Sequence, residues 1–284
     1  MARIAYVNGR YLPLPAAAIA VEDRGLQFAD SVYEVVAIAD GRLIDEEPHL
    51  DRLDRSLAEI RLDAPLARPA LRRVMREVVR RNRIAGGMLY LQITRGRARR
   101  DPVFPAQARP TVIMTARRLK PQAPQALAAG IAVQCVPDPR WRRRDIKTVA
   151  LLPNVLVRNA ARAEGFADAW LVDDDGLVTE GTFSNAWIVT RAGEIVTRPR
   201  SHDILWGITR RTMLLLAAEL GLTLIERPFT VAEAKAAAEA FITGATSYVT
   251  PVTRIDDGVL GTGTIGPVTR RLAERYSAYM AART

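Results

Sequence analysis

Alternating hydrophobic and polar positions dominate the first 45 residues of the chain. Two such runs flank Asn8-Gly9, and two more flank Asp40-Gly41. Asn-Gly and Asp-Gly between alternating runs are typical of the two-residue turns of β-hairpins. The pattern therefore predicts one hairpin over residues 4–12 and a second over residues 32–44.

A three-and-four spacing of apolar residues replaces the alternation after the second hairpin. Apolar residues recur in this way from Leu50 to Ile60, with charged residues between them, and again over residues 71–79. This spacing predicts two amphipathic helices. Strands are predicted at 88–94 and 111–116, so the first part of the chain has an α+β pattern.

Residues 119–129 (LKPQAPQALAA) interrupt this pattern with two prolines and little periodicity. We interpret the segment as an interdomain linker between a small N-terminal domain, 1–118, and a larger domain, 130–284. In the larger domain, strands are predicted at 131–136, 169–172, 177–179, 186–189, 194–197, 222–226 and 241–243. Helices are predicted at 153–164, at 209–220 with Gly221 closing it, at 231–238 and at 268–282.

The composition is that of a globular chain with a sizeable core. The chain has 284 residues, of which 49% are hydrophobic and 25% charged. It has no run of 18 apolar residues and no signal-peptide pattern, so we expect neither a membrane span nor secretion. The single cysteine, Cys135, excludes an internal disulfide, which fits a reducing, cytoplasmic setting.

The positive charge is concentrated in the middle of the chain. The net charge is +10, and residues 68–144 contain 19 basic and three acidic residues. Such a stretch could bind nucleic acid, but it has neither zinc-finger spacing nor an aromatic-rich RNA-binding signature. We therefore expect a solvated arginine-rich face, or a surface that attracts small anions, and no nucleic-acid partner.

Lysine is rare in this basic chain. Of the 41 basic residues, only Lys120, Lys147 and Lys235 are lysines. A lysine amine can be deprotonated and can form an imine, whereas arginine stays protonated. Lys120 lies in the proline-containing linker and Lys235 in an exposed helical pattern, while Lys147 has mostly apolar neighbours. Lys147 is therefore the candidate nucleophile.

Three polar segments of the larger domain could bind an anionic cofactor. Residues 179–185 contain Glu180, which needs a partner because burying a bare carboxylate is costly. Gly207 opens a helix whose first N–H groups can receive a phosphate, and residues 243–247 form a hydroxyl-rich turn. A nucleophilic lysine, a carboxylate and phosphate-binding turns together suggest pyridoxal phosphate, with no metal.

Ten blocks of the sequence strengthen this interpretation. They are, in chain order, YVNGRYLP, DRGLQFADSVYEV, HLDRLDRS, LQITRG…FP, RWRRRDIKT, LLPNVLVRNAA, VTEGTFSNAW, ILWGITR, ERPFT and ITGATSYVTPV. In this order the chain resembles the fold-type IV pyridoxal-phosphate enzymes, which include D-amino acid and branched-chain aminotransferases, (R)-amine transaminases and aminodeoxychorismate lyases. The resemblance implies a small α+β domain and a larger pseudo-barrel domain, with the cofactor between them and active sites built at a homodimer interface.

The resemblance also implies a role for each site residue. Lys147 would form the Schiff base and move the proton between Cα and C4′, and Glu180 would bond the pyridinium nitrogen. Tyr33 would line the substrate side. The other implied cofactor contacts are Leu205 to the ring, and Arg52, Ile208, Thr209 and Thr246 to the phosphate.

Within the family, DRG-x-x-F-x-D-x-VYE and VTEG-x-x-SN favour the D-amino acid (D-alanine) aminotransferase branch. The expected reaction is transamination of D-amino acids, with 2-oxoglutarate or pyruvate as acceptor. Members of this branch trap the substrate carboxylate with Arg-x-His, where this chain has Arg100 and Pro102. Proline cannot donate a hydrogen bond, so the grip on the carboxylate is expected to be looser.

Three other activities of the family remain open from the sequence. They are transamination of (R)-amines, transamination of branched-chain L-amino acids, and aminodeoxychorismate lyase activity. From a different class, a non-catalytic nucleic-acid-binding protein would need neither Lys147 nor Glu180.

Overall fold

The computed structural model describes residues 3–107, 109–120 and 123–282, and the chain divides into two compact units. The first unit comprises Met1–Pro121, Ile146–Ala150 and Met280–Thr284. The second comprises Gln122–Asp145 and Leu151–Tyr279. The short segment that carries Lys147 therefore belongs to the first unit, although residues of the second precede and follow it.

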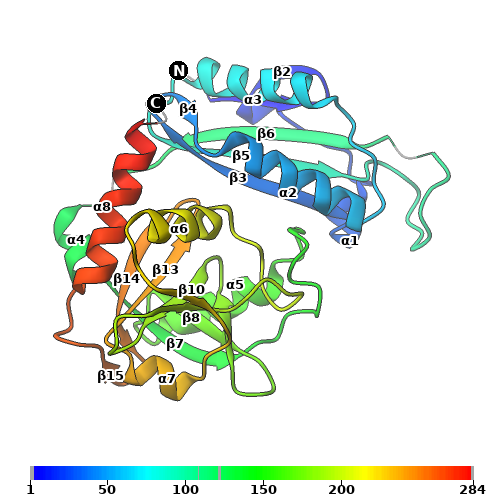
Figure 1. Ribbon diagram of the computed structural model, residues 1–284. Coiled ribbons are helices and arrows are strands. Elements are labelled where there is room, and N and C mark those ends of the chain that lie inside the picture. Colours follow the sequence, from blue (N-terminus) through cyan, green and yellow to red (C-terminus); the bar gives the residue numbers. More distant parts are fainter. Residues whose placement is uncertain (1–2, 108, 121–122, 283–284) are drawn as a thin grey trace. The chain divides into compact units, whose positions relative to one another are not determined.

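The first unit is built on a six-stranded antiparallel sheet, shown in Figure 1, with strand order β2-β1-β6-β5-β3-β4. Its strands are β1 (Ile4–Val7), β2 (Arg10–Pro13), β3 (Ser31–Ala39), β4 (Arg42–Leu43), β5 (Gly87–Thr94) and β6 (Thr111–Arg118). The two hairpin turns have positive φ angles at Asn8, Gly9, Asp40 and Gly41. Both predicted hairpins are therefore confirmed, because a type I′ turn needs positive φ at both central residues.

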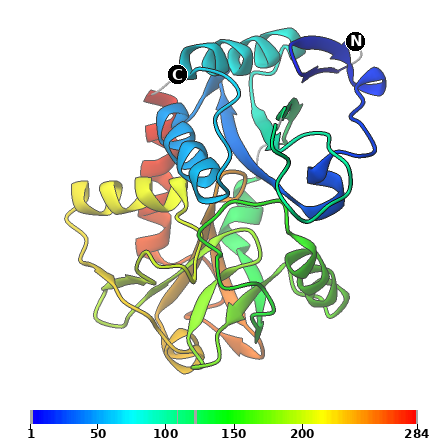
Figure 2. The same cartoon turned by 90° about the vertical axis from the view of Figure 1, so that its right-hand side faces the viewer.

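Helices cover one face of this sheet. They are α2 (Glu46–Glu59) and α3 (Arg68–Asn82), and both confirm the predicted helices. Two shorter elements, the 3₁₀ turn η1 (Leu14–Ala16) and the helix α1 (Arg24–Phe28), precede β3 in the chain. Leu53 of α2 and Met75 of α3 pack with Leu89 and Leu91 of β5 in one buried core, and Figure 2 shows the helices beside the sheet. Alternate β5 residues, such as Tyr90, face the other side.

The second unit contains a nine-stranded mixed sheet of the pseudo-barrel type. The strand order is β12-β11-β10-β13-β14-β7-β8-β9, and β15 pairs with β14. The strands are β7 (Ile131–Pro137), β8 (Asp168–Val172), β9 (Val178–Gly181), β10 (Asn185–Val189), β11 (Ile195–Thr197), β12 (Leu224–Glu226), β13 (Glu239–Gly244), β14 (Tyr248–Ile255) and β15 (Gly258–Val259). The fold class, α+β with a small first domain and a pseudo-barrel second domain, is as expected.

Five helices accompany this sheet among the described residues. They are α4 (Pro124–Ala129), α5 (Leu152–Ala163), α6 (Ile208–Glu219), α7 (Val231–Ala236) and α8 (Pro267–Ala282). A buried core around Trp170, Ile188, Phe229 and Ile242 joins the strands to α7. Helix α4 was not predicted and lies within the segment that we expected to be a linker, of which residues 121 and 122 are outside the described residues.

Strand β14 was also missed, because Pro251 weakens a strand pattern. In the structure Pro251 lies opposite Phe241 of β13, while the pairing of β14 with β7 begins only at Val252. Pro251 therefore lies at a position where β14 has no partner residue in β7, so no backbone N–H is needed for pairing on that side.

No helix in the described part of the chain has the length and apolar character needed to cross a bilayer.

Candidate active site

Lys147 lies on an extended segment at the edge of β3. The Tyr33 N–H donates to the Lys147 carbonyl at 3.0 Å, and the Val149 N–H donates to the Ser31 carbonyl at 3.3 Å. The Lys147 N–H donates to the Ser56 hydroxyl at 3.4 Å. These backbone bonds fix the position from which the lysine side chain projects, although the segment is not a regular strand.

The Lys147 amine lies against Tyr33. Its Nζ is 4.3 Å from the centroid of the Tyr33 ring, and the Tyr33 and Tyr90 rings are 5.6 Å apart. Burial, with the Tyr33 hydroxyl nearby, raises the pKa of Tyr90 to about 12, so this phenol stays neutral at physiological pH. The structure thus brings together two of the predicted site residues, Lys147 and Tyr33, beside a second aromatic ring.

Arg52 is buried on α2 and is bound to a carboxylate of β3. Its Nε and Nη2 donate to Glu34 Oε1 and Oε2, each at 2.7 Å, and His49 Nδ1 donates to Oε2 at 2.7 Å. Burial opposes ionisation of Glu34, but the charge and hydrogen bonds of Arg52 lower the pKa of Glu34 to about 2. Burial lowers the pKa of His49. Arg52 is therefore held in one orientation by a paired carboxylate.

Arg52 and Tyr33 lie on opposite faces of β3. Glu34 lies on the face that α2 covers, and successive residues of a strand point to opposite faces. The structure therefore places the Tyr33 ring with the Lys147 amine, while Arg52 lies one turn of α2 before Ser56, whose hydroxyl accepts from the Lys147 N–H.

Glu180 lies on β9, and its side chain is buried in the second unit. Arg140 Nη1 donates to its Oε1 at 2.6 Å, and Asn185 Nδ2 donates to its Oε2 at 3.0 Å. The Leu205 N–H lies 3.1 Å from both oxygens. Four donor contacts thus hold the carboxylate in place, and one of the donors is the backbone of Leu205, another predicted cofactor contact.

The charge of Glu180 depends on Arg140. Burial raises the pKa of Glu180, and the Arg140 guanidinium opposes that shift. Burial disfavours the charged Arg140 too, but Glu180 and Asp138 raise its pKa; Arg140 Nη2 donates to Asp138 Oδ2 at 2.8 Å. The predicted carboxylate therefore has the partner that its burial requires.

Asn185 connects Glu180 to the start of α6. Its Nδ2 also donates to the Leu205 carbonyl at 2.9 Å. A Cβ on Gly207 would lie 2.0 Å from Asn185 Oδ1, so only glycine fits there. Helix α6 begins at the next residue, Ile208, and no side chain caps it. The buried N–H groups of Ile208 and Thr209 thus form a positive helix end suited to an anion.

The turn that carries Thr246 lies beside the same asparagine. Asn185 is opposite Thr243 in the β10–β13 ladder, and the turn follows at the end of β13. A Cβ on Gly244 would lie 2.7 Å from Ser247 Oγ, which shows how tightly the turn is folded. Thr246 itself is exposed. Asn185 thus has the predicted residues of the second unit around it: Glu180, Leu205, Ile208, Thr209 and the turn of Thr246.

Arg100, the predicted substrate residue, lies on an exposed loop of the first unit. Its guanidinium carbon is 5.2 Å from the centroid of the Phe28 ring. Arg24, on the nearby helix α1, is buried and bound to Asp30 and to the carbonyls of the same loop. Arg100 is therefore the more accessible of the two charges.

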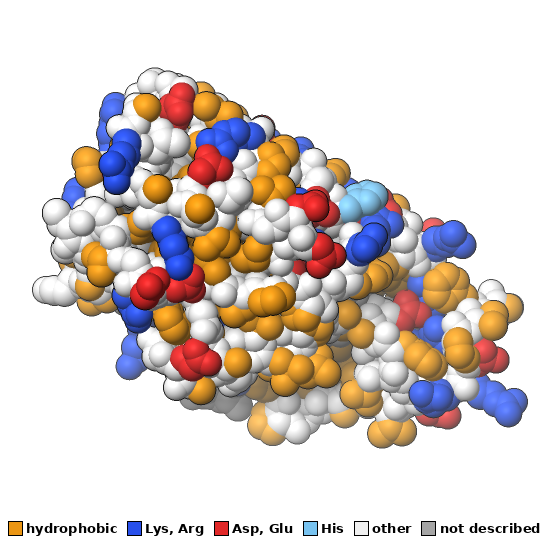
Figure 3. All heavy atoms as spheres, turned by 90° about the horizontal axis from the view of Figure 1, so that it is seen from below, with side chains coloured by type: hydrophobic (Ala, Val, Ile, Leu, Met, Phe, Trp, Pro, Cys, Tyr) orange, Lys and Arg blue, Asp and Glu red, His pale blue; other side chains and the backbone are white. Residues whose placement is uncertain are grey.

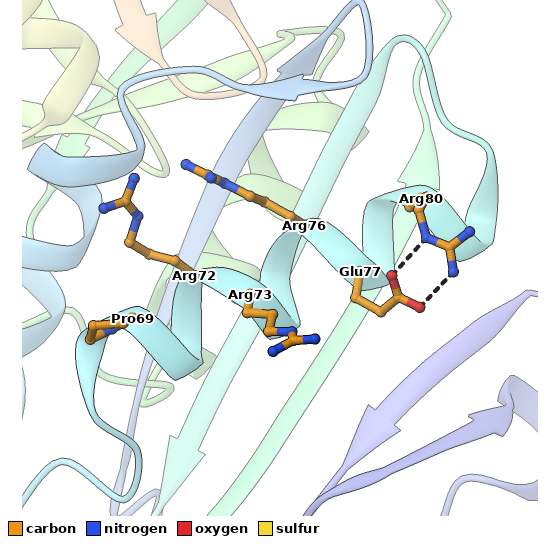
Figure 4. A pocket seen from close by; sticks show the side chains of 6 residues that line it. All are labelled: Pro69, Arg72, Arg73, Arg76, Glu77 and Arg80. Carbon is orange, nitrogen blue, oxygen red and sulfur yellow. Dashed lines mark hydrogen bonds and ion pairs between the residues drawn. The ribbon is translucent and has the colours of Figure 1, made fainter.

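A groove of about 480 Å³ follows the outer face of α3. Figure 4 shows that its lining side chains all come from this helix: Pro69, Arg72, Arg73, Arg76, Glu77 and Arg80. Three of these arginines are paired: Arg76 Nη2 lies 2.5 Å from Glu46, Arg72 Nη1 3.0 Å from Glu47, and Arg80 Nε 2.7 Å from Glu77. Acidic side chains thus offset much of the charge of this part of the basic stretch.

Charges of both signs are mixed elsewhere on the surface. On the face shown in Figure 3, basic and acidic side chains alternate with hydrophobic ones. Within the described residues, no group of three His, Cys, Asp or Glu side chains could hold a metal ion.

The residues of the second unit fit pyridoxal phosphate. An uncapped, buried helix end suits its phosphate, and the Gly207 position leaves no room for a side chain. A buried carboxylate with a raised pKa gains from a cationic partner such as a pyridinium nitrogen. The donor set therefore matches a flat, anionic cofactor with a basic ring nitrogen.

Sequence reasoning missed the residues that support the site. Arg140, Asn185 and Glu34 contact predicted residues, yet none was assigned a role. A signal existed for Arg140, because a buried Glu180 required a cationic partner and the segment 140–144 contains four arginines. No local pattern distinguishes Asn185 from the other polar residues of the segment 179–185.

Comparison with known proteins identifies the family to which the chain belongs. Residues 31–255 match the family model described as amino-transferase class IV. The chain is 40% identical over 266 residues to a D-alanine aminotransferase of Bacillus licheniformis, with 93% of each chain covered. It is 36% identical over 279 residues to a D-alanine aminotransferase of Staphylococcus haemolyticus, with 98% of each covered.

A solved structure with the same fold is the branched-chain amino acid aminotransferase of Escherichia coli. The TM-score is 0.93 at 26% identity, and the match covers 100% of this chain and 96% of that one. The chain belongs to the class IV aminotransferase family. As a member of that family, it is a pyridoxal-phosphate-dependent aminotransferase that acts on small-molecule substrates.

Proposed function

We propose that this enzyme transfers the amino group of D-amino acids, D-alanine among them, to a 2-oxo acid such as 2-oxoglutarate or pyruvate. One observation carries the proposal: relatives that are 36–40% identical over almost the whole chain are D-alanine aminotransferases. The D-branch blocks around Tyr33 and Glu180 support the same assignment.

Pyridoxal phosphate, when bound, supplies an electron sink for the negative charge that develops at the substrate Cα. In the second unit, Glu180 would bind the ring nitrogen and keep it protonated, because Arg140 and Asn185 fix the position of its carboxylate. Leu205 would pack on the ring. The N–H groups of Ile208 and Thr209, with Thr246, would hold the phosphate.

In the first unit, Lys147 would attach the cofactor through its Nζ and would then move the proton between Cα and C4′. The Tyr33 ring contacts the amine from one side. Arg52 would provide a further phosphate contact through the guanidinium that Glu34 holds in place.

Arg100 would bind the substrate α-carboxylate, and Tyr33 would line the substrate side. Pro102 has no side-chain donor where the Arg-x-His pattern of this branch implies histidine, so one charge-assisted hydrogen bond is expected to be missing. Such a bond is worth about 1.5–3 kcal/mol, or roughly one to two decades in affinity. The enzyme should therefore have a high KM for D-alanine.

A second candidate substrate class is branched-chain L-amino acids, because the E. coli enzyme with the same fold is a branched-chain aminotransferase. The sequence identity to that enzyme is 26%, against 40% for the D-alanine aminotransferase of B. licheniformis. The D-amino acid assignment is therefore preferred.

A substrate panel tests the assignment directly. Purified enzyme with pyridoxal phosphate and 2-oxoglutarate is offered D-alanine, L-leucine, (R)-1-phenylethylamine and, without an acceptor, aminodeoxychorismate. D-alanine should give the highest kcat/KM. Turnover of L-leucine with no turnover of any D-amino acid would overturn the substrate assignment and leave the cofactor chemistry in place.

We infer a homodimer from the surface of α5. Leu152, Val155 and Leu156 share one side of this helix and are 67%, 43% and 62% exposed. An apolar stripe of this kind is typical of surfaces that become buried on association. Light scattering should give twice the 31.3 kDa chain mass.

We also infer a cytoplasmic location from the single cysteine.

A further inference from the structure

Arg24 is a buried arginine that the proposed mechanism does not use. It lies on α1, is 2% exposed, and donates through Nε to Asp30 Oδ2 at 2.8 Å. A guanidinium this deeply buried needs hydrogen-bond acceptors for all its donors. The positions of these acceptors therefore indicate which part of the structure Arg24 holds in place.

The remaining acceptors are backbone carbonyls of the loop that carries Arg100. Arg24 Nη1 donates to the carbonyls of Asp101 and Val103, the latter at 3.4 Å, and Nη2 lies 3.4 Å from the Pro102 carbonyl. One side chain thus binds three consecutive residues of an exposed loop that has no regular strand of its own.

A second buried arginine restrains the next residue of the loop. Arg95 Nε donates to Asp30 Oδ2 at 2.7 Å, so both arginines share one carboxylate oxygen. Arg95 also donates to the carbonyls of Ile60 and Arg61, and its guanidinium carbon is 3.8 Å from the centroid of the Phe104 ring. Asp30 therefore links Arg24 of α1 to Arg95, and the two arginines together contact residues 101–104.

Phe28 connects this anchor to Arg100 itself. The guanidinium carbon of Arg24 is 4.7 Å from the Phe28 ring centroid, and that of Arg100 is 5.2 Å from the same centroid. The position of Arg100 is thus set by a ring and a loop that Arg24 contacts at the same time.

We propose that Arg24 is a specificity-determining positioning residue: its bonds to the carbonyls of Asp101, Pro102 and Val103 hold the loop so that Arg100 can bind a substrate carboxylate. The proposal rests on the proposed function for the role of Arg100, but the restraint on the loop is independent of it. With Pro102 supplying no side-chain donor, recognition of the carboxylate depends on how well this single arginine is placed.

Trypsin provides a readout of the restraint that does not depend on activity. The exposed loop contains Arg97, Arg99 and Arg100 as cleavage sites, and proteases cut such loops faster when they are mobile. In the pyridoxal-phosphate-loaded enzyme, Arg24→Lys keeps the charge but loses the fork that reaches three carbonyls. Cleavage at these sites should accelerate at least tenfold.

Kinetics provide the second readout. Arg24→Lys should raise KM for D-alanine about tenfold with little change in kcat, and should leave KM for (R)-1-phenylethylamine, which has no carboxylate, unchanged. The matched control is Arg97→Lys, because Arg97 is 71% exposed and pairs only at the surface with Glu22. This control should behave as the wild type in both assays.

A second variant covers the case in which Arg24→Lys does not fold. Phe28→Leu removes the ring between Arg24 and Arg100 without leaving a buried charge unpaired, and should raise KM for D-alanine in the same way. Unchanged trypsin cleavage in the folded variants, or faster cleavage with an unchanged KM for D-alanine, would overturn the proposal. If Arg100→Ala leaves D-alanine kinetics untouched, the proposed role of Arg100 fails, and the trypsin result still decides whether Arg24 restrains the loop.

Discussion

At the scale of single residues, substitutions of Lys147 can distinguish a covalent role of its amine from a role of its positive charge. The backbone of Lys147 is fixed at the edge of β3, and its amine lies on the Tyr33 ring. Because arginine stays protonated and cannot form an imine, Lys147→Arg should be as inactive as Lys147→Ala. Transamination of D-alanine measures the effect, and borohydride reduction followed by mass spectrometry locates the attached cofactor. Lys235→Arg, at an exposed surface lysine, is the control and should retain activity.

Glu180 is the second residue whose chemistry can be isolated. Glu180→Gln should retain the cofactor but slow proton abstraction by two or more decades, because a neutral amide cannot hold the ring nitrogen protonated. Stopped-flow absorbance with D-alanine measures this half-reaction. A variant that abstracts the proton at the wild-type rate would mean that Glu180 has a structural role only.

The pair of Glu34 and Arg52 predicts how stability depends on pH. The pKa of Glu34 is about 2 in the folded chain, against 4.5 for an ordinary glutamate. This difference contributes roughly 3 kcal/mol above pH 4.5, and the contribution is lost as pH falls from 4.5 towards 2. Thermal unfolding between pH 6 and pH 2 should therefore show a smaller loss of stability for Glu34→Gln than for the wild type over the acid range. An equal loss of stability with falling pH in the wild type and in Glu34→Gln would contradict the lowered pKa of Glu34.

At the scale of elements, the N-terminus of helix α8 is capped by a carboxylate from strand β13, that of Glu239. The Val268 and Thr269 N–H groups donate to Glu239 Oε1 and Oε2 at 2.9 and 2.7 Å, and Gly266 leaves the space that this carboxylate occupies. Glu239→Gln keeps one acceptor only and loses the negative charge at the helix N-terminus. It should reduce the free energy of unfolding by about 1–2 kcal/mol.

Denaturant titration of the apoenzyme and the holoenzyme measures this loss. Glu274→Gln, at an exposed position on the same helix, serves as the control and should have little effect. A Glu239→Gln variant as stable as the wild type would show that water or another group replaces the cap.

At the scale of the whole molecule, cofactor binding should be visible as stability. A ligand that binds only the folded chain stabilises it by about 2.7 kcal/mol at a hundredfold excess over Kd. Removal of pyridoxal phosphate should therefore lower the Tm by roughly 5 °C or more in a chain of this size. Calorimetry of the apoenzyme with and without added cofactor measures the shift, and Lys147→Ala should show a smaller one because it loses the covalent attachment. No shift on adding cofactor to the wild type would contradict the proposed site.

Much of the fold follows from local signals in the sequence. Asn8-Gly9 and Asp40-Gly41 predict their hairpins, because few other dipeptides adopt positive φ at both turn positions. The spacing from Leu50 to Ile60 predicts α2, because only a helix places these residues on one face. The family blocks, and with them the candidate site residues, are likewise visible along the chain.

Other features depend on contacts that the linear sequence does not contain. Pro251 lies within a strand only because β7 begins its pairing one residue later. Arg140 reaches Glu180 across 40 residues, and Arg24 reaches Pro102 across 78. The sequence alone predicted the hairpin turns, most of the helices and the candidate reactive groups, because short-range geometry and side-chain chemistry are local properties. Only the tertiary structure decided which arginine pairs with which carboxylate, because burial and long-range packing select those partners.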